Sequence, residues 1–150
     1  MAAQPLSVVQ QLLARRDEVT RAKRYLAYFQ AYTSTYAEVE YLQRMYEEAL
    51  SVSDMVGLCV GTRPDCVPDA VLDLLAGYQA RGYEVWLELG LQSANDKTLQ
   101  RINRGHGYAA YEDAVSRAHA RGIKVCAHLI VGLPGEVPMD SLDTLHRIVA

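Results

Sequence analysis

The chain has 150 residues, half of them hydrophobic, and is long enough to bury one sizeable core. Its formal net charge is -3 and its Lys and Arg residues are scattered, so this segment carries no footprint of sequence-independent nucleic-acid binding. No apolar run approaches the roughly 18 residues that span a bilayer, and the N-terminus lacks the apolar stretch of a signal peptide. We therefore expect a cytoplasmic protein without membrane contact, whose three cysteines are reduced thiols.

Hydrophobic periodicity predicts helices that alternate with strands along the chain. Helices are expected over residues 6–16, 35–50, 68–81, 95–102 and 111–121, and from about residue 140 onward. Strands are expected over residues 25–32, 56–61, 83–92 and 123–131. The second helix has the clearest start signal, because Thr35 and Glu38 have the spacing of a capping box.

Four strands separated by helices indicate successive right-handed βαβ units and hence a parallel sheet. This α/β pattern fits either a doubly wound sheet or part of a (β/α) barrel. Neither GxGxxG after the first strand nor GxxxxGK[ST] occurs, so the common nucleotide-binding signatures of open sheets are missing. The barrel is therefore the favoured interpretation.

The residue pattern on the two faces of the strands also favours a barrel. Side chains alternate across a strand, so Leu87 and Leu89 face helices while Glu88 lies on the opposite side. The other strands also place polar or small residues on that side, as a barrel lumen holding a ligand requires. These groups concentrate toward the carboxyl ends of the strands, where barrel enzymes place their chemistry. Glu88 is expected to pair with an interior cation, Lys124 or Arg63, or to meet substrate, because an unpaired buried carboxylate is costly.

The stretch CVGTRPDC raises the question of a metal site. Cys59 falls on the lumen face of a strand and Cys66 lies beyond a turn, so the two thiols point into different environments. A shared zinc ion would need Cys126 and His128 to converge with them from another strand. Thiols that pack as small apolar groups are the favoured interpretation, and no metal site is expected in this chain.

Four motifs in order, GTRPD, ELGLQS, INRGH and HLIVGLPGE, resemble the strand and loop motifs of radical SAM enzymes. The resemblance is to the YhcC-type subfamily, near the elongator-type tRNA-modifying branch, and covers about residues 24–136. It implies a partial TIM barrel of the (β/α)6 type that binds a [4Fe-4S] cluster and S-adenosylmethionine (SAM). Reductive cleavage of SAM would supply a 5'-deoxyadenosyl radical that acts on an unknown substrate.

One departure from the family pattern is an absence. The cluster loop CxxxCxxC of radical SAM enzymes does not occur in this sequence. We therefore expect residues 1–150 to be the central portion of a single core domain, incomplete at both ends and covering roughly its second to fifth strands. On this interpretation the segment alone binds no cluster and catalyses nothing.

The resemblance also implies SAM contacts at the strand ends. Gln30 and Thr33 stand where the family meets the amino group of SAM, although QAYT replaces the usual sequence of the Gly-Gly-Glu type. Arg63 can hold a carboxylate, with an ion pair to an aspartate, Asp65 or Asp69, as the structural alternative. The fourth- and fifth-strand motifs imply further contacts from Gln92, Ser93, His128, Ile130 and Gly132.

Two of these assignments stay open. Gly61 replaces a Glu that in relatives is suited to the SAM ribose, so that contact is in doubt. His128 is expected to donate a hydrogen bond to SAM or to exchange a proton with substrate, or else to be a satisfied core histidine. At the level of the whole protein, the alternative to an enzyme is a non-catalytic, barrel-derived scaffold that binds a small molecule or a protein partner.

Overall fold

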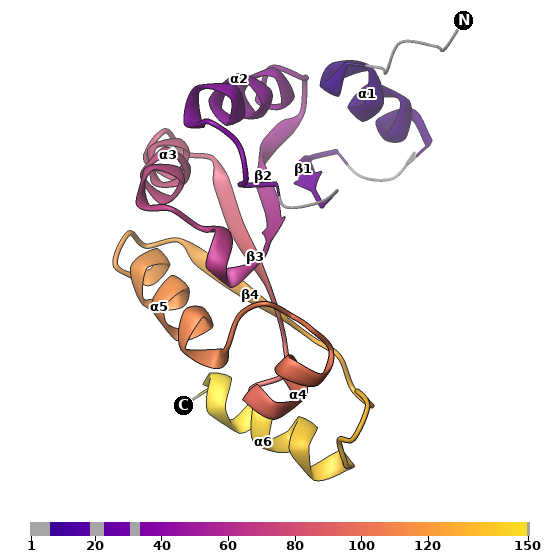
Figure 1. The fold of residues 1–150 in the computed structure, drawn as a ribbon. Helices are drawn as coiled ribbons and strands as arrows, with labels where there is room; N and C mark the ends of the chain where they lie inside the picture. Colours follow the sequence, from indigo (N-terminus) through magenta and orange to yellow (C-terminus); the bar gives the residue numbers. More distant parts are fainter. Residues whose placement is uncertain (1–6, 19–22, 31–33, 150) are drawn as a thin grey trace, which may run out of the picture.

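The structure is a computed structural model that describes residues 7–18, 23–30 and 34–149. Four parallel strands form one sheet in the order β1-β2-β3-β4, which is also their order along the chain (Figure 1). The strands are β1 (Tyr25–Phe29), β2 (Met55–Thr62), β3 (Glu84–Gln92) and β4 (Lys124–Leu129). The predicted alternation of strands and crossover helices is confirmed.

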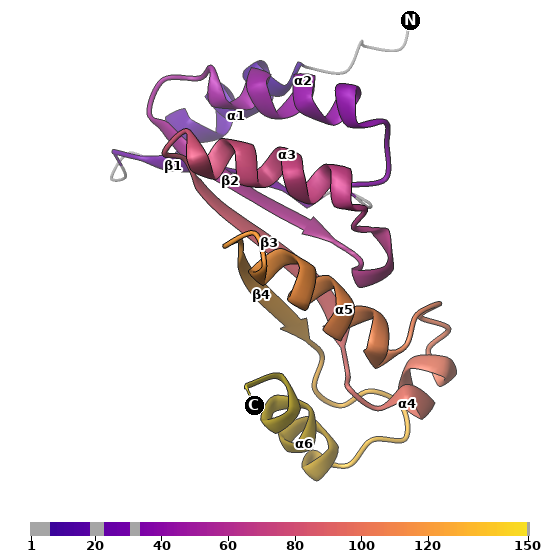
Figure 2. The ribbon, with the colours of Figure 1, turned by 90° about the vertical axis from the view of Figure 1, so that its left-hand side faces the viewer.

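Helices α2, α3 and α5 cover one face of this sheet (Figures 1 and 2). They are the crossover helices α2 (Val39–Leu50), α3 (Asp69–Ala80) and α5 (Tyr108–His119). Three further helices are α1 (Val8–Glu18), α4 (Asp96–Arg101) and α6 (Pro138–Val149), and a 3-10 turn spans Pro64–Cys66. None of the described helices is long and apolar enough to cross a membrane.

The core lies between the sheet and the crossover helices α2, α3 and α5. In β3 the alternation is complete, since Leu87 and Leu89 are fully buried while the side chain of Glu88 between them faces away. Helix residues such as Tyr46 and Leu75 pack against the same layer. Each fully buried aliphatic or aromatic side chain contributes about 1.5 to 3 kcal/mol relative to exposure, so the layer is a main source of stability.

The opposite face of the sheet carries the polar and small residues, and we call it the open face, defined by Tyr28, Cys59, Glu88, Cys126 and His128. Parallel register brings these residues together, because a residue and its partner on the next strand point to the same side. Glu88 is in register with Cys126, and Gly90 with His128. The predicted division of the strands into an apolar and a polar face is confirmed.

One predicted helix start is wrong. α2 begins at Val39, and its N-cap residue Glu38 makes no side-chain capping bond. Thr35 is instead buried, and its hydroxyl donates to the carbonyl of Cys66 and lies 2.6 Å from the hydroxyl of Thr62. The capping-box spacing therefore arises from a residue that ties the segment after β1 to the end of β2.

Other boundaries differ where a tertiary contact sets them. α5 begins at Tyr108, three residues before the predicted start at Tyr111, because Asp96 of α4 accepts the Tyr108 amide at 2.7 Å. α6 begins at Pro138 through a local contact, since Asp140 accepts the amide of Val137 at 2.7 Å. The end of the first predicted strand, residues 31–32, lies outside the described residues.

Candidate functional site

Glu88 stands at the centre of a side-chain network on the open face. Tyr28 of β1 donates its hydroxyl to Oε2 at 2.7 Å, and Cys59 of β2 donates its thiol to Oε1 at 2.8 Å. Nε2 of His128, on β4, lies 2.8 Å from the same Oε2. One carboxylate thus links side chains from all four strands.

This network shifts the ionisation of its members. Partial burial favours the neutral acid, but hydrogen bonds from Cys59, Tyr28 and His128 outweigh it and lower the pKa of Glu88. The hydrogen bond to Glu88, with burial adding to it, raises the pKa of Tyr28 to about 12. Burial, then the same carboxylate, raise the pKa of Cys59 to about 12. At neutral pH the site holds an ionised Glu88 beside a neutral phenol and a neutral thiol.

The predicted cation partners of Glu88 are elsewhere. Lys124 lies on β4 in register with Trp86, pairs with Glu84 at 2.5 Å and lies 5.3 Å from the centre of the Trp86 ring. Glu84 also accepts the Trp86 indole N–H at 2.8 Å. The expected pairing of Glu88 with Lys124 or Arg63 is therefore wrong, because the imidazole of the neighbouring strand reaches the carboxylate instead.

Arg63 follows β2 and forms the ion pair predicted as its structural alternative. Its Nε and Nη2 donate to the two carboxylate oxygens of Asp65 at 2.9 and 2.6 Å. Burial opposes ionisation of Asp65, yet these bonds from Arg63 lower its pKa. Nη2 also lies 3.0 Å from where a Cβ on Gly105 would be, so the guanidinium lies against the loop after α4.

Gln92 ends β3 in an unusual backbone conformation. Its φ is +73°, in the left-handed region that a non-glycine residue rarely adopts. A Cβ on Gly90 would lie 2.9 Å from its Nε2, so the amide folds back over the open face at Gly90. Its side chain makes no hydrogen bond to any residue that the structure describes. Backbone strain of this kind clusters at functional sites.

Arg104 completes this end of the site and was missed by sequence reasoning. Its Nη2 donates to the carbonyl of Gly90 at 2.7 Å, and its Nε donates to Nε2 of His106 at 3.1 Å. Partial burial, together with the positive charge of Arg63, lowers the pKa of Arg104. The INRGH motif contained this signal, but nothing local tells which of its side chains turns back over the sheet.

His106 supports the arginine as a neutral group. Burial lowers the pKa of His106, and the charge of Arg104 adds to this effect. Because its Nε2 accepts from Arg104, its proton lies on Nδ1, 3.3 Å from the carbonyl of Gly107. The ring therefore orients the guanidinium without adding charge.

The remaining predicted positions are spread around the strand ends. Gln30 directly follows β1, is exposed, and lies beside Gly61, where its Cγ is 4.0 Å from the position of a Cβ. Ser93 is 1% exposed and donates to Glu136 at 2.5 Å. Ile130 is 47% exposed and donates its amide to the carbonyl of Gln92.

Two further positions complete the predicted set. Gly132 has a φ of +83°, and no atom lies within 4 Å of its would-be Cβ, so the chain turns there in open space. Thr33 lies outside the described residues.

The cysteines do not converge on a common centre. Cys59 is bonded to Glu88, Cys66 lies in the 3-10 turn after β2, and Cys126 lies on β4. Among the residues described, no three His, Cys, Asp or Glu side chains are arranged to hold a metal ion. The zinc arrangement considered from the sequence is therefore not formed by them.

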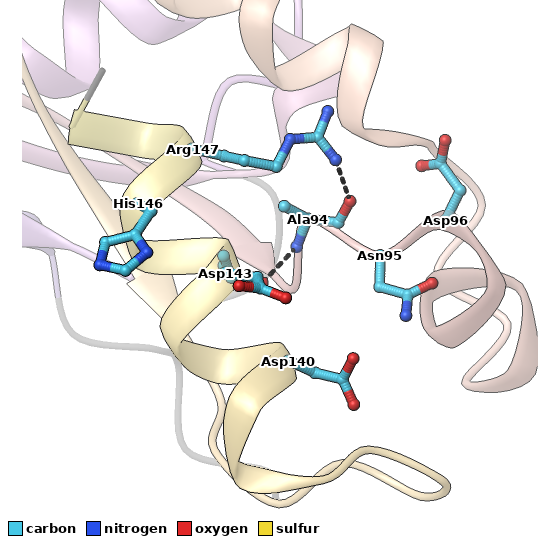
Figure 3. Close-up of a pocket in the computed structure, with 8 residues that line it drawn as sticks. Ala94, Asn95, Asp96, Asp140, Asp143, His146 and Arg147 are labelled. Atoms are coloured by element: carbon cyan, nitrogen blue, oxygen red, sulfur yellow. Dashed lines mark hydrogen bonds between the residues drawn. The ribbon is translucent and has the colours of Figure 1, made fainter.

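A separate hollow of about 530 Å³ lies between α4 and α6 (Figure 3). Ala94 forms its floor, accepting from Arg147 at 2.9 Å and donating to Thr144 at 3.0 Å. Arg147 also lies 3.8 Å from the centre of the Tyr108 ring. None of the predicted site residues lines this hollow, and its contacts serve to attach α6 to the rest of the fold.

Comparison with known proteins places these features in context. A family model described as the Radical SAM superfamily matches residues 4–148. Protein YhcC of Escherichia coli strain K12 is 64% identical over 148 residues, which cover 99% of this chain and 48% of YhcC. The chain therefore spans about half the length of this relative.

Two solved structures share the fold. Elp3 of Methanocaldococcus infernus matches with a TM-score of 0.75 at 20% identity, over 95% of this chain and 37% of Elp3. Coproporphyrinogen III oxidase (HemN) of Escherichia coli, described as a radical SAM enzyme, matches with a TM-score of 0.65 at 19% identity, over 94% of this chain and 33% of HemN. The predicted α/β fold, four parallel strands with flanking helices as in a partial barrel, is confirmed.

Proposed function

Because the chain belongs to the radical SAM superfamily, we propose that it forms the central portion of an enzyme that binds SAM at the carboxyl ends of β1 to β4. The observation that carries the proposal is the cluster of Gln92, Arg104 and Arg63 beside Gly90 and Gly105. It offers an amide with no hydrogen-bond partner among the described residues, and two guanidinium groups, at one end of the open face. When bound at a reduced [4Fe-4S] cluster, SAM supplies a 5'-deoxyadenosyl radical to the substrate.

The chain's own residues fit SAM and do not fit the cluster. SAM carries a carboxylate, hydroxyl groups and an adenine ring, which guanidinium, amide and small apolar groups can recognise. Cys59 and Cys126 lie on the open face and Cys66 in the 3-10 turn after β2, and the residues that the structure describes provide no centre for iron. In this proposal the cluster ligands come from another part of the whole protein.

Individual roles follow from position. Arg104 and Arg63 hold the carboxylate of SAM, with Asp65 and neutral His106 keeping the two guanidinium groups in place. Gln92 binds the ribose through its free amide, and Ser93 supports this turn through its bond to Glu136.

Other residues line the rest of the cofactor. Ile130 and Gly132 provide an apolar surface and close backbone approach for adenine. Gln30 and Thr33 meet the amino group of SAM. Glu88 and Lys124 remain on the substrate side of the site.

The position of the sheet edges supports a larger barrel. β1 and β4 each pair on one side only within the described sheet. A hollow of about 360 Å³ lies beside β4, lined by Trp86 of β3, by Val125, Cys126 and Ala127 of β4, by α5 and by the end of α6. In the whole protein this edge is available to a further strand, as a single core domain larger than these 150 residues requires.

The proposal is tested on the full-length protein after anaerobic reconstitution with iron and sulfide. With a reductant it should form 5'-deoxyadenosine from SAM. Arg104→Met should weaken SAM binding by about 10-fold to 100-fold, because a hydrogen bond to a charged group contributes about 1.5 to 3 kcal/mol. Arg121→Met, which removes ion pairs from the turn after α5 to Asp69 and Asp73 of α3, is the matched control. A protein that holds a full cluster but neither binds nor cleaves SAM would point to the non-catalytic scaffold instead.

A further inference from the structure

The Glu88 network leaves one nitrogen of His128 unused. Oε2 of Glu88 accepts from Nε2 of the ring at 2.8 Å, and the side chain of Glu88 is only 15% exposed. An ionised carboxylate can only accept hydrogen bonds, so Nε2 carries a proton in this contact. Nδ1 is then the nitrogen that turns away from the carboxylate.

The His128 side chain is partly exposed on the open face. The His128 side chain is 41% exposed, and Nδ1 has no hydrogen-bond partner among the residues that the structure describes. Tyr28, 46% exposed, lies on the other side of Glu88 and shares the same carboxylate oxygen. The contact with Glu88 therefore leaves Nδ1 as the ring nitrogen that a ligand on the open face can meet.

The Glu88 network does more than join neighbouring strands. Three donors converge on two oxygens, which keeps Glu88 ionised although it is mostly buried. A fixed negative charge behind one ring nitrogen stabilises positive charge on the ring when the other nitrogen gains a proton. This is the arrangement by which carboxylates orient histidines that act as acids and bases.

We propose that His128 exchanges a proton with the substrate through Nδ1, and that Glu88 is the positioning residue that holds it. This inference rests on the proposed function and chooses the substrate over SAM as the partner of His128. A proton leaving a substrate oxygen or nitrogen bonds to Nδ1 while its electron pair stays on the substrate atom. The resulting imidazolium is balanced by the Glu88 carboxylate, and the reverse transfer returns the proton.

The location on the sheet supports the substrate assignment. The guanidinium and amide groups suited to SAM gather beyond Gly90, at the ends of the strands. His128 is itself in register with Gly90, but its Nε2 is held 2.8 Å from Glu88, which lies two residues before Gly90 on β3. Tyr28 and Cys59, which bond to the same carboxylate, lie in register with each other on β1 and β2. The substrate recognised here carries an ionisable oxygen or nitrogen.

The first test reads the tautomer directly. In the full-length protein labelled with ¹⁵N-histidine, neutral His128 should be found as the Nε2–H form, assigned by its loss in His128→Gln. In Glu88→Gln the amide can donate as well as accept, so the tautomers should mix. Glu84→Gln is the matched control, because it removes a carboxylate from the same strand that pairs with Lys124 instead. Mixed tautomers in the wild type, or an unchanged signal in Glu88→Gln, would overturn the positioning role.

The second test separates substrate from SAM. Diethyl pyrocarbonate modifies a free imidazole nitrogen, and peptide mass mapping gives the rate at His128 with exposed His146 as the internal reference. Saturating SAM on the reconstituted protein should change the rate at His128 less than 2-fold. Protection of 10-fold or more by SAM would make His128 a SAM contact and sink the proposal. The formation of 5'-deoxyadenosine decides the proposed function separately, since the tautomer test needs neither cluster nor SAM.

Discussion

Tyr28 and His128 lie on the two outer strands of the sheet, yet both meet Oε2 of Glu88, at 2.7 and 2.8 Å. Because Cys59 donates to the other oxygen, a substitution of Glu88 removes or weakens contacts to side chains on all three other strands. Single substitutions at this carboxylate should therefore alter the titration and reactivity of side chains that are distant in sequence.

Glu88→Gln should lower the pKa of Tyr28 from about 12 toward the ordinary value near 10. The main cause of the raised pKa is the hydrogen bond from the neutral phenol to the carboxylate, and a neutral amide accepts less strongly. The ¹³Cζ signal of Tyr28, assigned with Tyr28→Phe, reports the titration. Because this pKa is raised on folding, the stability it contributes is complete below about pH 10 and is lost as pH rises through about 12. An unchanged midpoint in Glu88→Gln would contradict the hydrogen bond.

Cys59 should react slowly with iodoacetamide although its side chain is not fully buried. A pKa of about 12 leaves roughly a thousandth of the thiolate that an ordinary cysteine has near pH 8, and the thiolate is the nucleophile. Glu88→Gln should accelerate the reaction only in part, because burial is the largest cause of the shift and stays in place. Mass mapping of the alkylated peptides gives the rate, with Glu112→Gln on the exposed side of α5 as the control. Alkylation of wild-type Cys59 at the rate of a free thiol would show that the raised pKa is wrong.

Gly90→Ala should disturb the SAM end of the site more than it disturbs folding. The new methyl group would lie 2.7 Å from Nη2 of Arg104 and 2.9 Å from Nε2 of Gln92, so both side chains must move. These are flexible ends, so we expect the free energy of unfolding to change by less than about 1.5 kcal/mol while SAM binding weakens 10-fold or more. Urea unfolding and equilibrium dialysis measure the two effects.

Gly77→Ala is the matched control for that substitution. No atom lies within 4 Å of a Cβ at Gly77, which is inside α3, so the change should stabilise the protein by about 0.5 to 1 kcal/mol and leave SAM binding as it was. If Gly90→Ala bound SAM as tightly as Gly77→Ala, the positions assigned to Arg104 and Gln92 would not matter for the cofactor.

Thr35→Val should destabilise the fold by about 1 to 3 kcal/mol. The substitution keeps the shape of a residue that is 2% exposed but removes its hydroxyl, which leaves the buried hydroxyl of Thr62 and the carbonyl of Cys66 without that partner. Glu38→Ala should change the free energy of unfolding by less than about 0.5 kcal/mol, because Glu38 makes no capping bond. If urea unfolding showed a larger loss of stability for Glu38→Ala than for Thr35→Val, the capping-box interpretation would be correct instead.

Much of the fold was predictable because it depends on local pattern. The alternation of Leu87, Glu88 and Leu89 identified a strand with one buried face, and the register of the sheet agrees with it. The predicted helix boundaries were wrong where a hydrogen bond to a residue elsewhere in the chain sets the start of the helix or takes its expected cap. Thr35 bonds to the end of β2, and Asp96 of α4 sets the start of α5.

The sequence predicted that Glu88 and His128 share one face of the sheet, but it did not predict which side chains pair there. The sequence places Glu88 and His128 on one face of neighbouring strands. From the sequence alone, however, Lys124 and Arg63 were equally suitable partners for the Glu88 carboxylate, and the structure pairs them with other acids. The register of the strands places His128, and not these cations, within 2.8 Å of Glu88. Arg104 was not among the predicted site residues, because only the fold of the loop after α4 brings its side chain to the carbonyl of Gly90.

By itself, then, the amino-acid sequence determined the parallel sheet, its apolar and polar faces and the family of the chain. These properties follow from periodicity and short motifs, which local backbone geometry transmits directly. Only the tertiary structure decided that one ionised carboxylate binds a phenol, a thiol and an imidazole, with no partner for Nδ1 of His128 among the residues that the structure describes. Hydrogen bonds act over about 3 Å, so their partners are selected by the packing of strands that lie far apart along the chain.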